Sequence, residues 1–159
     1  MRGVRYLGYS FYMMKGKCQL AVHPKSKAKM KSRLKEELTS RSNGWGYAKR
    51  KQKLKEYIRG WVGYYHLANM KRLLLETDEW LRRRIRKCIW KAWKKGKTKV
   101  ANLIRCGINK HQAYEWGNTC KGYWRIADSY ILHRAITNEH LYRAGYATFM
   151  GAYLEWHPK

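Results

Sequence analysis

A dense run of cations in the middle of the chain is followed by tryptophans. Five of the six residues in Arg82–Lys87 are cationic, and Trp90 and Trp93 follow among further lysines. Guanidinium groups bind phosphate oxygens and stack on bases, and indole rings offer stacking platforms for unpaired nucleotides. A solvated helix face with core tryptophans is the competing interpretation, but such faces normally mix charges of both signs. The run therefore predicts phosphate binding.

A second set of cations recurs at helical spacing. Lys25, Lys29 and Arg33 are four residues apart, so they lie along one face if this segment is a helix. That face could also meet phosphates. The apolar residues Met30, Leu34 and Leu38 have the same period and predict a separate buried stripe.

Groups suited to catalysis are sparse. Two-metal nucleotidyl transfer needs carboxylates that share ions about 3.5–4 Å apart, but the two aspartates, Asp78 and Asp128, are fifty positions apart. Glu76 and Glu79 flank Asp78, where helix capping explains them better. The six histidines form no nuclease block, and no glycine-rich phosphate loop is present. We expect no enzymatic activity, no metal site and no cofactor.

The composition indicates a folded protein with a polyanionic partner. The 159 residues hold 36 Lys and Arg against 10 Asp and Glu, a formal net charge of +26. Eight tryptophans and thirteen tyrosines argue against disorder. Charge of this size favours a neutralising partner. The sequence contains no run of about 18 apolar residues, the length that would predict a membrane span. Four scattered cysteines and no signal peptide predict a reduced, cytoplasmic protein.

The elements that must position these residues begin with a β-hairpin over residues 4–23. Alternating aromatics predict its strands, and Lys15-Gly16-Lys17 predicts its turn. Because an isolated hairpin is marginal in water, it must pack on another element. Pro24 ends the hairpin, and a helix is expected from Lys25 to about Thr39.

Two clearer helices and several short ones follow. Leu54, Ile58, Trp61, Val62 and Tyr65 lie on one face of the first. The second is expected to begin at Thr77 as N-cap, with a buried face of Leu81, Ile85, Cys88, Ile89 and Ala92 and with Arg82, Arg83, Arg86 and Lys87 projecting elsewhere. Short helices are expected near residues 100–107, 126–131 and 138–144. The predicted fold class is mainly α: a three-helix bundle preceded by a β-hairpin and followed by short helices.

Two motifs together resemble group II intron-encoded reverse transcriptases, also called maturases. They are Arg-Gly-Trp-Val-Gly-Tyr-Tyr at 59–65 and Asp-Glu-Trp-Leu-Arg-Arg-Arg at 78–84. Tyr6-Leu7-Gly8-Tyr9-Ser10-Phe11 resembles the last polymerase block, and Lys121-Gly122-Tyr123-Trp124 resembles the C-terminal part of bacterial members. The resemblance divides the chain into an end-of-palm hairpin (1–23), the maturase-specific domain X or thumb (24–107) and a C-terminal extension (108–159).

The resemblance implies binding of group II intron RNA and help in folding it for splicing. No Tyr-x-Asp-Asp motif and no zinc endonuclease pattern occurs, so we expect a fragment or split part of a reverse transcriptase without polymerase chemistry. Target DNA and an upstream polymerase polypeptide are the further partners that it allows. The candidate RNA-contact residues are Lys25, Lys29, Arg33, Arg59, Arg82, Arg83, Arg84, Arg86, Lys87, Lys91, Lys94 and Lys95.

Two alternatives stay open from the sequence. Residues from about Lys110 onward could meet a DNA duplex during intron mobility, which would make the chain a DNA-binding module. Alternatively, the chain could be a degenerate remnant that does not fold alone, since the edge of its hairpin needs a partner.

Overall fold

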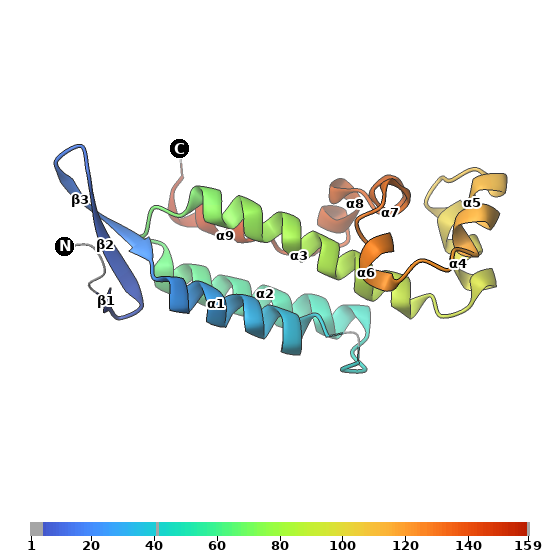
Figure 1. Cartoon of the computed structure of the whole chain (residues 1–159), viewed down its shortest axis with the longest axis horizontal. Coiled ribbons are helices and arrows are strands. Elements are labelled where there is room, and N and C mark those ends of the chain that lie inside the picture. The colour runs from blue at the N-terminus through green and yellow to red at the C-terminus, as the bar shows by residue number, and fades with distance from the viewer. Residues whose placement is uncertain (1–4, 41, 159) are drawn as a thin grey trace. The chain divides into compact units, whose positions relative to one another are not determined.

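The computed structural model describes residues 5–40 and 42–158 and has the mainly α fold expected from the sequence (Figure 1). The chain divides into two compact units. The first combines Met1–Leu38, Trp45–Glu79 and Tyr146–Lys159, and the second combines Thr39–Gly44 and Trp80–Gly145. The division into residues 1–23, 24–107 and 108–159 stays a prediction.

A small antiparallel sheet opens the first unit. Its strands are β1 (Arg5–Tyr6), β2 (Tyr9–Met14) and β3 (Lys17–Val22), in the order β1-β2-β3. Met14 pairs with Lys17 across the turn predicted at Lys15 and Gly16, where both residues have positive φ. The single first strand expected from Val4 is wrong, because Leu7 and Gly8 also have positive φ and turn the chain between β1 and β2. Val4 lies outside the described residues.

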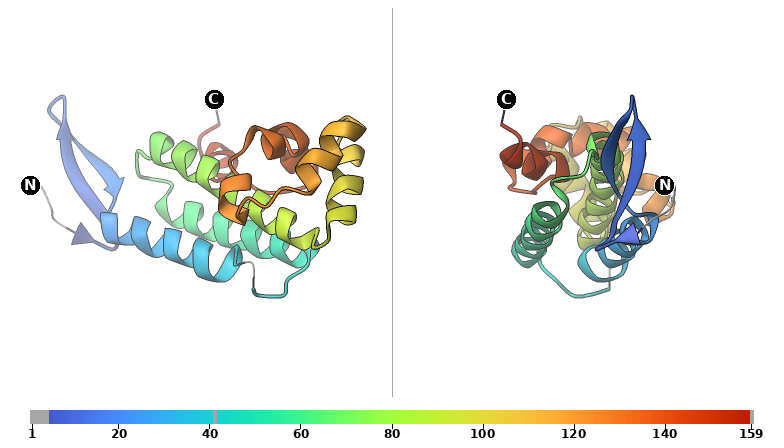
Figure 2. Two further views of the ribbon diagram at one scale, coloured as in Figure 1. Left: turned by 45° about the vertical axis from the view of Figure 1, so that its right-hand side comes forward. Right: turned by 90° about the vertical axis from the view of Figure 1, so that its left-hand side faces the viewer.

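Two helices run side by side after the sheet (Figure 1, Figure 2). The first, α1 (Pro24–Arg33), continues into a π-helical turn at Leu34–Leu38. The second is α2 (Tyr47–Tyr65). The predicted apolar stripes are buried, with Met30, Leu34 and Leu38 in the first helix and Leu54, Ile58 and Val62 in the second. Trp61 and Tyr65 are only half-buried.

The third long helix, α3 (Lys71–Ala92), begins earlier than expected. Thr77 does not cap it: its hydroxyl donates 2.7 Å to the Leu73 carbonyl, one turn back within the helix. Asp78 does act at a helix N-terminus, but at another helix. Its carboxylate accepts the backbone N–H groups of Phe149 (2.8 Å) and Met150 (2.9 Å), the first residues of α9 (Phe149–Trp156).

Five shorter helices lie in the second unit. They are α4 (Gly96–Arg105), α5 (Lys110–Gly117), α6 (Tyr123–Ile126), α7 (Tyr130–Ala135) and α8 (Asn138–Arg143), and α4 packs against α5 (Figure 2). The helices expected near 100–107 and 138–144 are confirmed. The one expected over 126–131 is two helices, because the chain turns at Asp128–Ser129, and α5 was not expected.

No helix in the described part of the chain combines the length and the apolar character that crossing a membrane requires.

Candidate nucleic-acid interface

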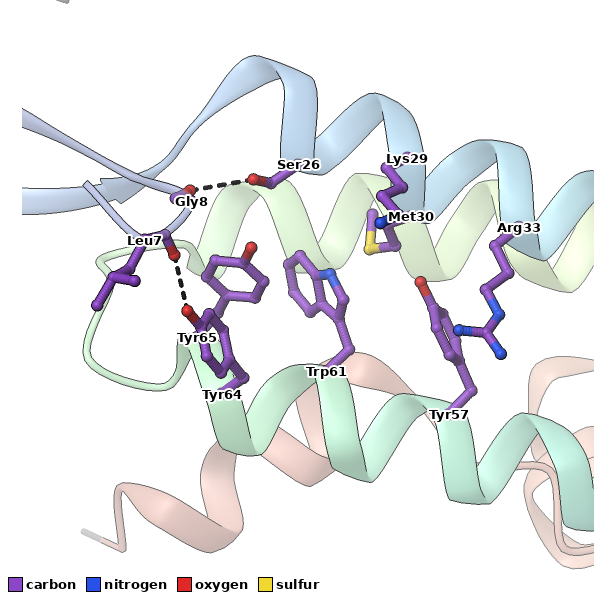
Figure 3. A pocket seen from close by; sticks show the side chains of 10 residues that line it. All are labelled: Leu7, Gly8, Ser26, Lys29, Met30, Arg33, Tyr57, Trp61, Tyr64 and Tyr65. Atoms are coloured by element: carbon purple, nitrogen blue, oxygen red, sulfur yellow. Dashed lines mark hydrogen bonds between the residues drawn. The ribbon is translucent and has the colours of Figure 1, made fainter. Parts of the chain in front are cut away.

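A groove between α1 and α2 brings cations and aromatic rings together in the first unit (Figure 3). Its volume is about 410 Å³. Lys29 and Arg33 line it from α1, and Leu7, Gly8 and Ser26 lie at its sheet end. The rest of its lining is mostly aromatic and comes from α2: Tyr57, Trp61, Tyr64 and Tyr65. Cations beside a row of aromatic rings are typical of nucleotide-binding sites, because the cations bind phosphates and the rings stack on bases.

Helical periodicity puts these side chains on facing sides of the two helices. Lys25, Lys29 and Arg33 are exposed along α1, while Met30 from the same helix is buried. Tyr57 and Trp61 are one turn apart on α2, and Figure 3 shows their rings pointing toward α1. Tyr57 was not singled out from the sequence. Its four-residue spacing from Trp61, matching the spacing of the cations, was the available signal.

The sheet end of the groove is fixed by hydrogen bonds. The Tyr64 hydroxyl donates 2.9 Å to the Leu7 carbonyl, and the Tyr9 hydroxyl donates to the Tyr64 carbonyl. Ser26 of α1 donates 3.1 Å to the Gly8 carbonyl. Gly8 has a φ of +84°, and a Cβ there would overlap the Tyr65 hydroxyl, so only glycine fits this turn. The hairpin therefore packs on its own helices, as its marginal stability requires.

The aromatic side chains of the groove also contact one another and their neighbours. Trp61 lies 4.7 Å from Tyr65 between ring centroids and meets Phe149 of α9 edge-on at 5.7 Å. The Arg33 guanidinium lies 5.1 Å from the centroid of Tyr57. Burial raises the pKa of the Tyr57 hydroxyl, and the charge of Arg33 opposes that shift. The Tyr57 hydroxyl therefore stays protonated and can donate a hydrogen bond at neutral pH.

Arg33 keeps its capacity to bind an anion. Its Nε lies 3.1 Å from Glu37, in a pair whose side chains are both more than half exposed. Exposed pairs of this kind contribute about 0.2–1 kcal/mol, so a phosphate can compete for the guanidinium. Lys25 and Lys29 are exposed on the same helix. These three predicted residues are thus placed together beside the groove.

The other candidate cations are placed differently. Arg59 is exposed on α2 and lines a second cavity, with Ala152, Glu155 and Trp156. In the second unit Lys94 and Lys95 are exposed, and Lys91, Arg82 and Arg83 are half-buried. Arg59 is not part of the groove lining, so the structure does not join it to the α1 cations in one cavity.

Three members of the central cationic run are buried. Arg84 donates from Nε to the Thr39 hydroxyl (2.7 Å), and Arg86 donates to the Ile136 carbonyl and the Asn138 side chain (both 2.8 Å). Burial lowers the pKa of both guanidinium groups. Lys87 is also buried. The expectation that Arg86 and Lys87 project away from the core is therefore wrong. Helices α6, α7 and α8 add carbonyl acceptors around α3 that its own sequence does not reveal.

We expect Arg86→Ala to lower the free energy of unfolding by about 1.5–3 kcal/mol, the usual cost of losing hydrogen bonds to a charged group. Arg86 is 2% exposed, and its Nε reaches the C-cap carbonyl of α7 at Ile136. Urea denaturation measures the change, with the exposed Lys94→Ala as a control that should stay near wild type. An unchanged stability together with weaker RNA binding would return Arg86 to the RNA-contact set.

Sequence comparison places the chain in a family. Residues 27–107, just over half of the chain, match the model of the group II intron maturase-specific domain. The chain belongs to this family. Both helices of the groove, α1 from its second turn and all of α2, fall inside the match, and so does all of α3. No curated protein matches the chain significantly. Family membership gives the protein a role in group II intron splicing and implies association with that RNA.

The burial of the tryptophans in this maturase-specific domain differs from what the sequence predicts. Trp90 and Trp93, expected as stacking platforms, are buried, with Trp90 only 1% exposed. Their ring centroids are 5.7 Å apart, and the Lys99 ammonium lies 4.8 Å from the Trp90 ring. Trp61, expected on the apolar face of its helix, is half-buried, and so is Trp80. The stretch Ile89–Val100 reads as basic and aromatic, but its indoles pack inward.

The described residues do not bring metal-ligating side chains together. In the residues that the structure describes, no three histidine, cysteine or acidic side chains come together as a possible metal site. Asp78 is committed to capping α9, and Asp128 pairs with Arg83 at 3.2 Å. His133 and His140 lie on separate helices, because Thr137 caps α8 between them. The maturase-specific domain is a non-catalytic domain, which fits this arrangement.

Proposed function

We propose that the protein binds group II intron RNA directly, and that the groove and the α1 cations Lys25, Lys29 and Arg33 form its main contact surface. One observation carries the proposal: an exposed cationic row lies along an aromatic groove with no acidic residue in its lining. Family membership supplies the identity of the RNA. Lys94 and Lys95 add positive charge in the second unit, and a net charge of +26 draws the polyanion from a distance.

The proposed mechanism is electrostatic capture followed by shape recognition. Lysine and arginine side chains neutralise phosphates and release condensed counterions. Rings in the groove then stack on bases exposed in loops, since sequence-specific contacts to RNA are made mostly at unpaired nucleotides. Binding the intron through both its phosphates and its loop bases in this way favours its splicing-active fold. In this proposal the protein supplies no nucleotidyl transfer and acts in the cytoplasm, as a fragment or split part of a reverse transcriptase.

The hypothesis that the chain is a degenerate remnant was based on the unpaired edge of the hairpin. The hairpin that raised it pairs with β1 and is hydrogen-bonded to α2 through Tyr9 and Tyr64. Cooperative thermal unfolding of the isolated chain is the expected behaviour. Competition between intron RNA and duplex DNA at equal ionic strength tests the DNA-binding alternative.

The variant Lys25→Ala, Lys29→Ala, Arg33→Ala should bind intron RNA about 50- to 200-fold more weakly at 0.15 M salt. That figure follows from losing three phosphate contacts, each worth about 0.7–0.9 in the slope of log affinity against log salt. Filter binding with a group II intron transcript measures it. Circular dichroism should show an unchanged fold, because all three side chains are exposed.

A matched control separates a specific surface from total charge. Lys17→Ala, Lys55→Ala, Lys71→Ala removes the same three charges from exposed positions that do not line the groove. We expect this control to lose much less affinity than the α1 variant. Equal losses would mean that the protein attracts RNA only through its net charge, and would remove the groove from the proposal.

A further inference from the structure

A further cavity, distinct from the groove and from the cavity beside Arg59, lies in the second unit and has an exposed tryptophan in its lining. Its volume is about 610 Å³, and its lining comes from α3 and from the segment that forms α6: Arg84, Lys87, Gly122, Tyr123, Trp124 and Arg125. The matched family region ends at residue 107, before this segment. Trp124 does not line the groove between α1 and α2.

Trp124 is more exposed than the other tryptophans described in the second unit, of which Trp80 is half-buried. Trp124 is 40% exposed, whereas Trp90, Trp93 and Trp116 are all buried. A fully buried aromatic side chain removes about 150–250 Å² from water, and Trp124 leaves a substantial part of that gain unused. Exposure of this kind, beside a cavity, is typical of a ring that receives a ligand.

The indole is held in place by charged neighbours. The Arg83 guanidinium lies 3.8 Å from its ring centroid and donates 3.1 Å to the Trp124 carbonyl. Asp128 fixes Arg83 through an ion pair of 3.2 Å. The ring is therefore pre-positioned before any ligand arrives, which reduces the entropy lost on binding. Arg83 is a positioning residue for Trp124 in this arrangement.

The cavity offers charge complementary to a phosphate. Arg125 lines it from α6 and is exposed, whereas Arg84 and Lys87 line it from α3 but are largely buried, so Arg125 is the cation that a phosphate can reach. No acidic residue lines it. A ring to stack on and cations within one cavity match an unpaired nucleotide, whose base is accessible and whose phosphate is charged. A base inside a duplex cannot reach the ring, because it is already stacked on its neighbours.

We propose that Trp124 and the cavity beside it hold one unpaired nucleotide, stacked on the indole with its phosphate near Arg125. This inference rests on the proposed function in that the ligand is nucleic acid, but it assigns a separate site on a different unit. The same chemistry is offered by a bulged nucleotide of RNA and by one of single-stranded DNA. The experiment below distinguishes the two sources.

The test uses the full chain and a pair of RNA duplexes that differ by one bulged nucleotide. Trp124→Ala should bind the bulged duplex about 5- to 100-fold more weakly, the range expected for loss of one stacked base. It should bind the fully paired duplex within about twofold of wild type. Tyr142→Ala is the matched control, since Tyr142 is an exposed aromatic of the same unit that does not line the cavity. It should bind both duplexes as wild type does.

A second measurement needs no variant. With 5-iodouridine as the bulged nucleotide, irradiation of the wild-type complex should cross-link the peptide that contains Trp124, as mass spectrometry would show. A cross-link mapped only to other residues, or equal losses on both duplexes for Trp124→Ala, overturns the site. The same measurements are made with DNA duplexes of matched sequence. Whichever bulged duplex binds more tightly, RNA or DNA, identifies the natural source of the nucleotide. If wild type binds neither RNA duplex at low salt, the proposed function itself fails, which is a distinguishable result.

Discussion

Replacing Trp90 with alanine should lower the free energy of unfolding by about 3–5 kcal/mol, the usual cost of deleting a fully buried aromatic side chain. Trp90 is 1% exposed and packs against Trp93. The surroundings of a deleted core side chain relax only partly, so a cavity remains and adds to the cost. For a domain whose total stability is about 5–15 kcal/mol, the loss is large.

Denaturant unfolding followed by circular dichroism measures the change at Trp90. Tyr142→Ala provides a comparison, because that ring is exposed and its loss should cost little. A Trp90→Ala protein with wild-type stability and weakened RNA binding would contradict the structure. It would restore the interpretation of Trp90 as a stacking platform.

Asp78→Ala should destabilise the first unit by about 3–6 kcal/mol, from two hydrogen bonds to a charged group worth roughly 1.5–3 kcal/mol each. The carboxylate is buried and holds the N-terminal amides of α9 at Phe149 and Met150. Without it, two amide donors in a partly or fully buried setting lose their acceptors. The Phe149 ring, which meets Trp61 in the groove, would also lose its anchor.

The adjacent acid gives a sharp control for Asp78. Glu79 follows it directly but is exposed, so Glu79→Ala should change stability by less than about 0.5 kcal/mol. Asp78→Asn should fall between the two, because the amide keeps one acceptor oxygen without the charge. Hydrogen exchange should locate the loss of protection in Phe149–Trp156. Protection lost instead at the start of α3 would return Asp78 to capping its own helix.

Periodicity in the sequence was enough to predict the long helices but not their ends. The four-residue repeat of Met30, Leu34 and Leu38 predicted a buried stripe that is present. Thr77-Asp78-Glu79 has the composition of a helix start, yet α3 begins at Lys71. Local residue preferences cannot reveal that the Thr77 hydroxyl bonds within its helix, or that Asp78 reaches a segment seventy residues away.

The candidate site was predictable only in part for a similar reason. Lys25, Lys29 and Arg33 have a period that places them on one face, and they are exposed there. Arg84 and Arg86 have the same charge, but carbonyls from Thr39 and Ile136 draw them inward. Whether a cation meets solvent or a buried carbonyl depends on elements distant in sequence. Tertiary structure, not composition, decides which arginines remain available to a phosphate.

Salt dependence of binding to a group II intron transcript tests the central claim most directly. If six to ten phosphates are contacted, affinity should fall by about 10³–10⁵ between 50 and 200 mM salt, along a straight line in log affinity against log salt. Filter binding over that range gives the slope. Absence of binding at 50 mM salt, or an affinity that does not change with salt, would contradict a surface built to hold RNA by its backbone.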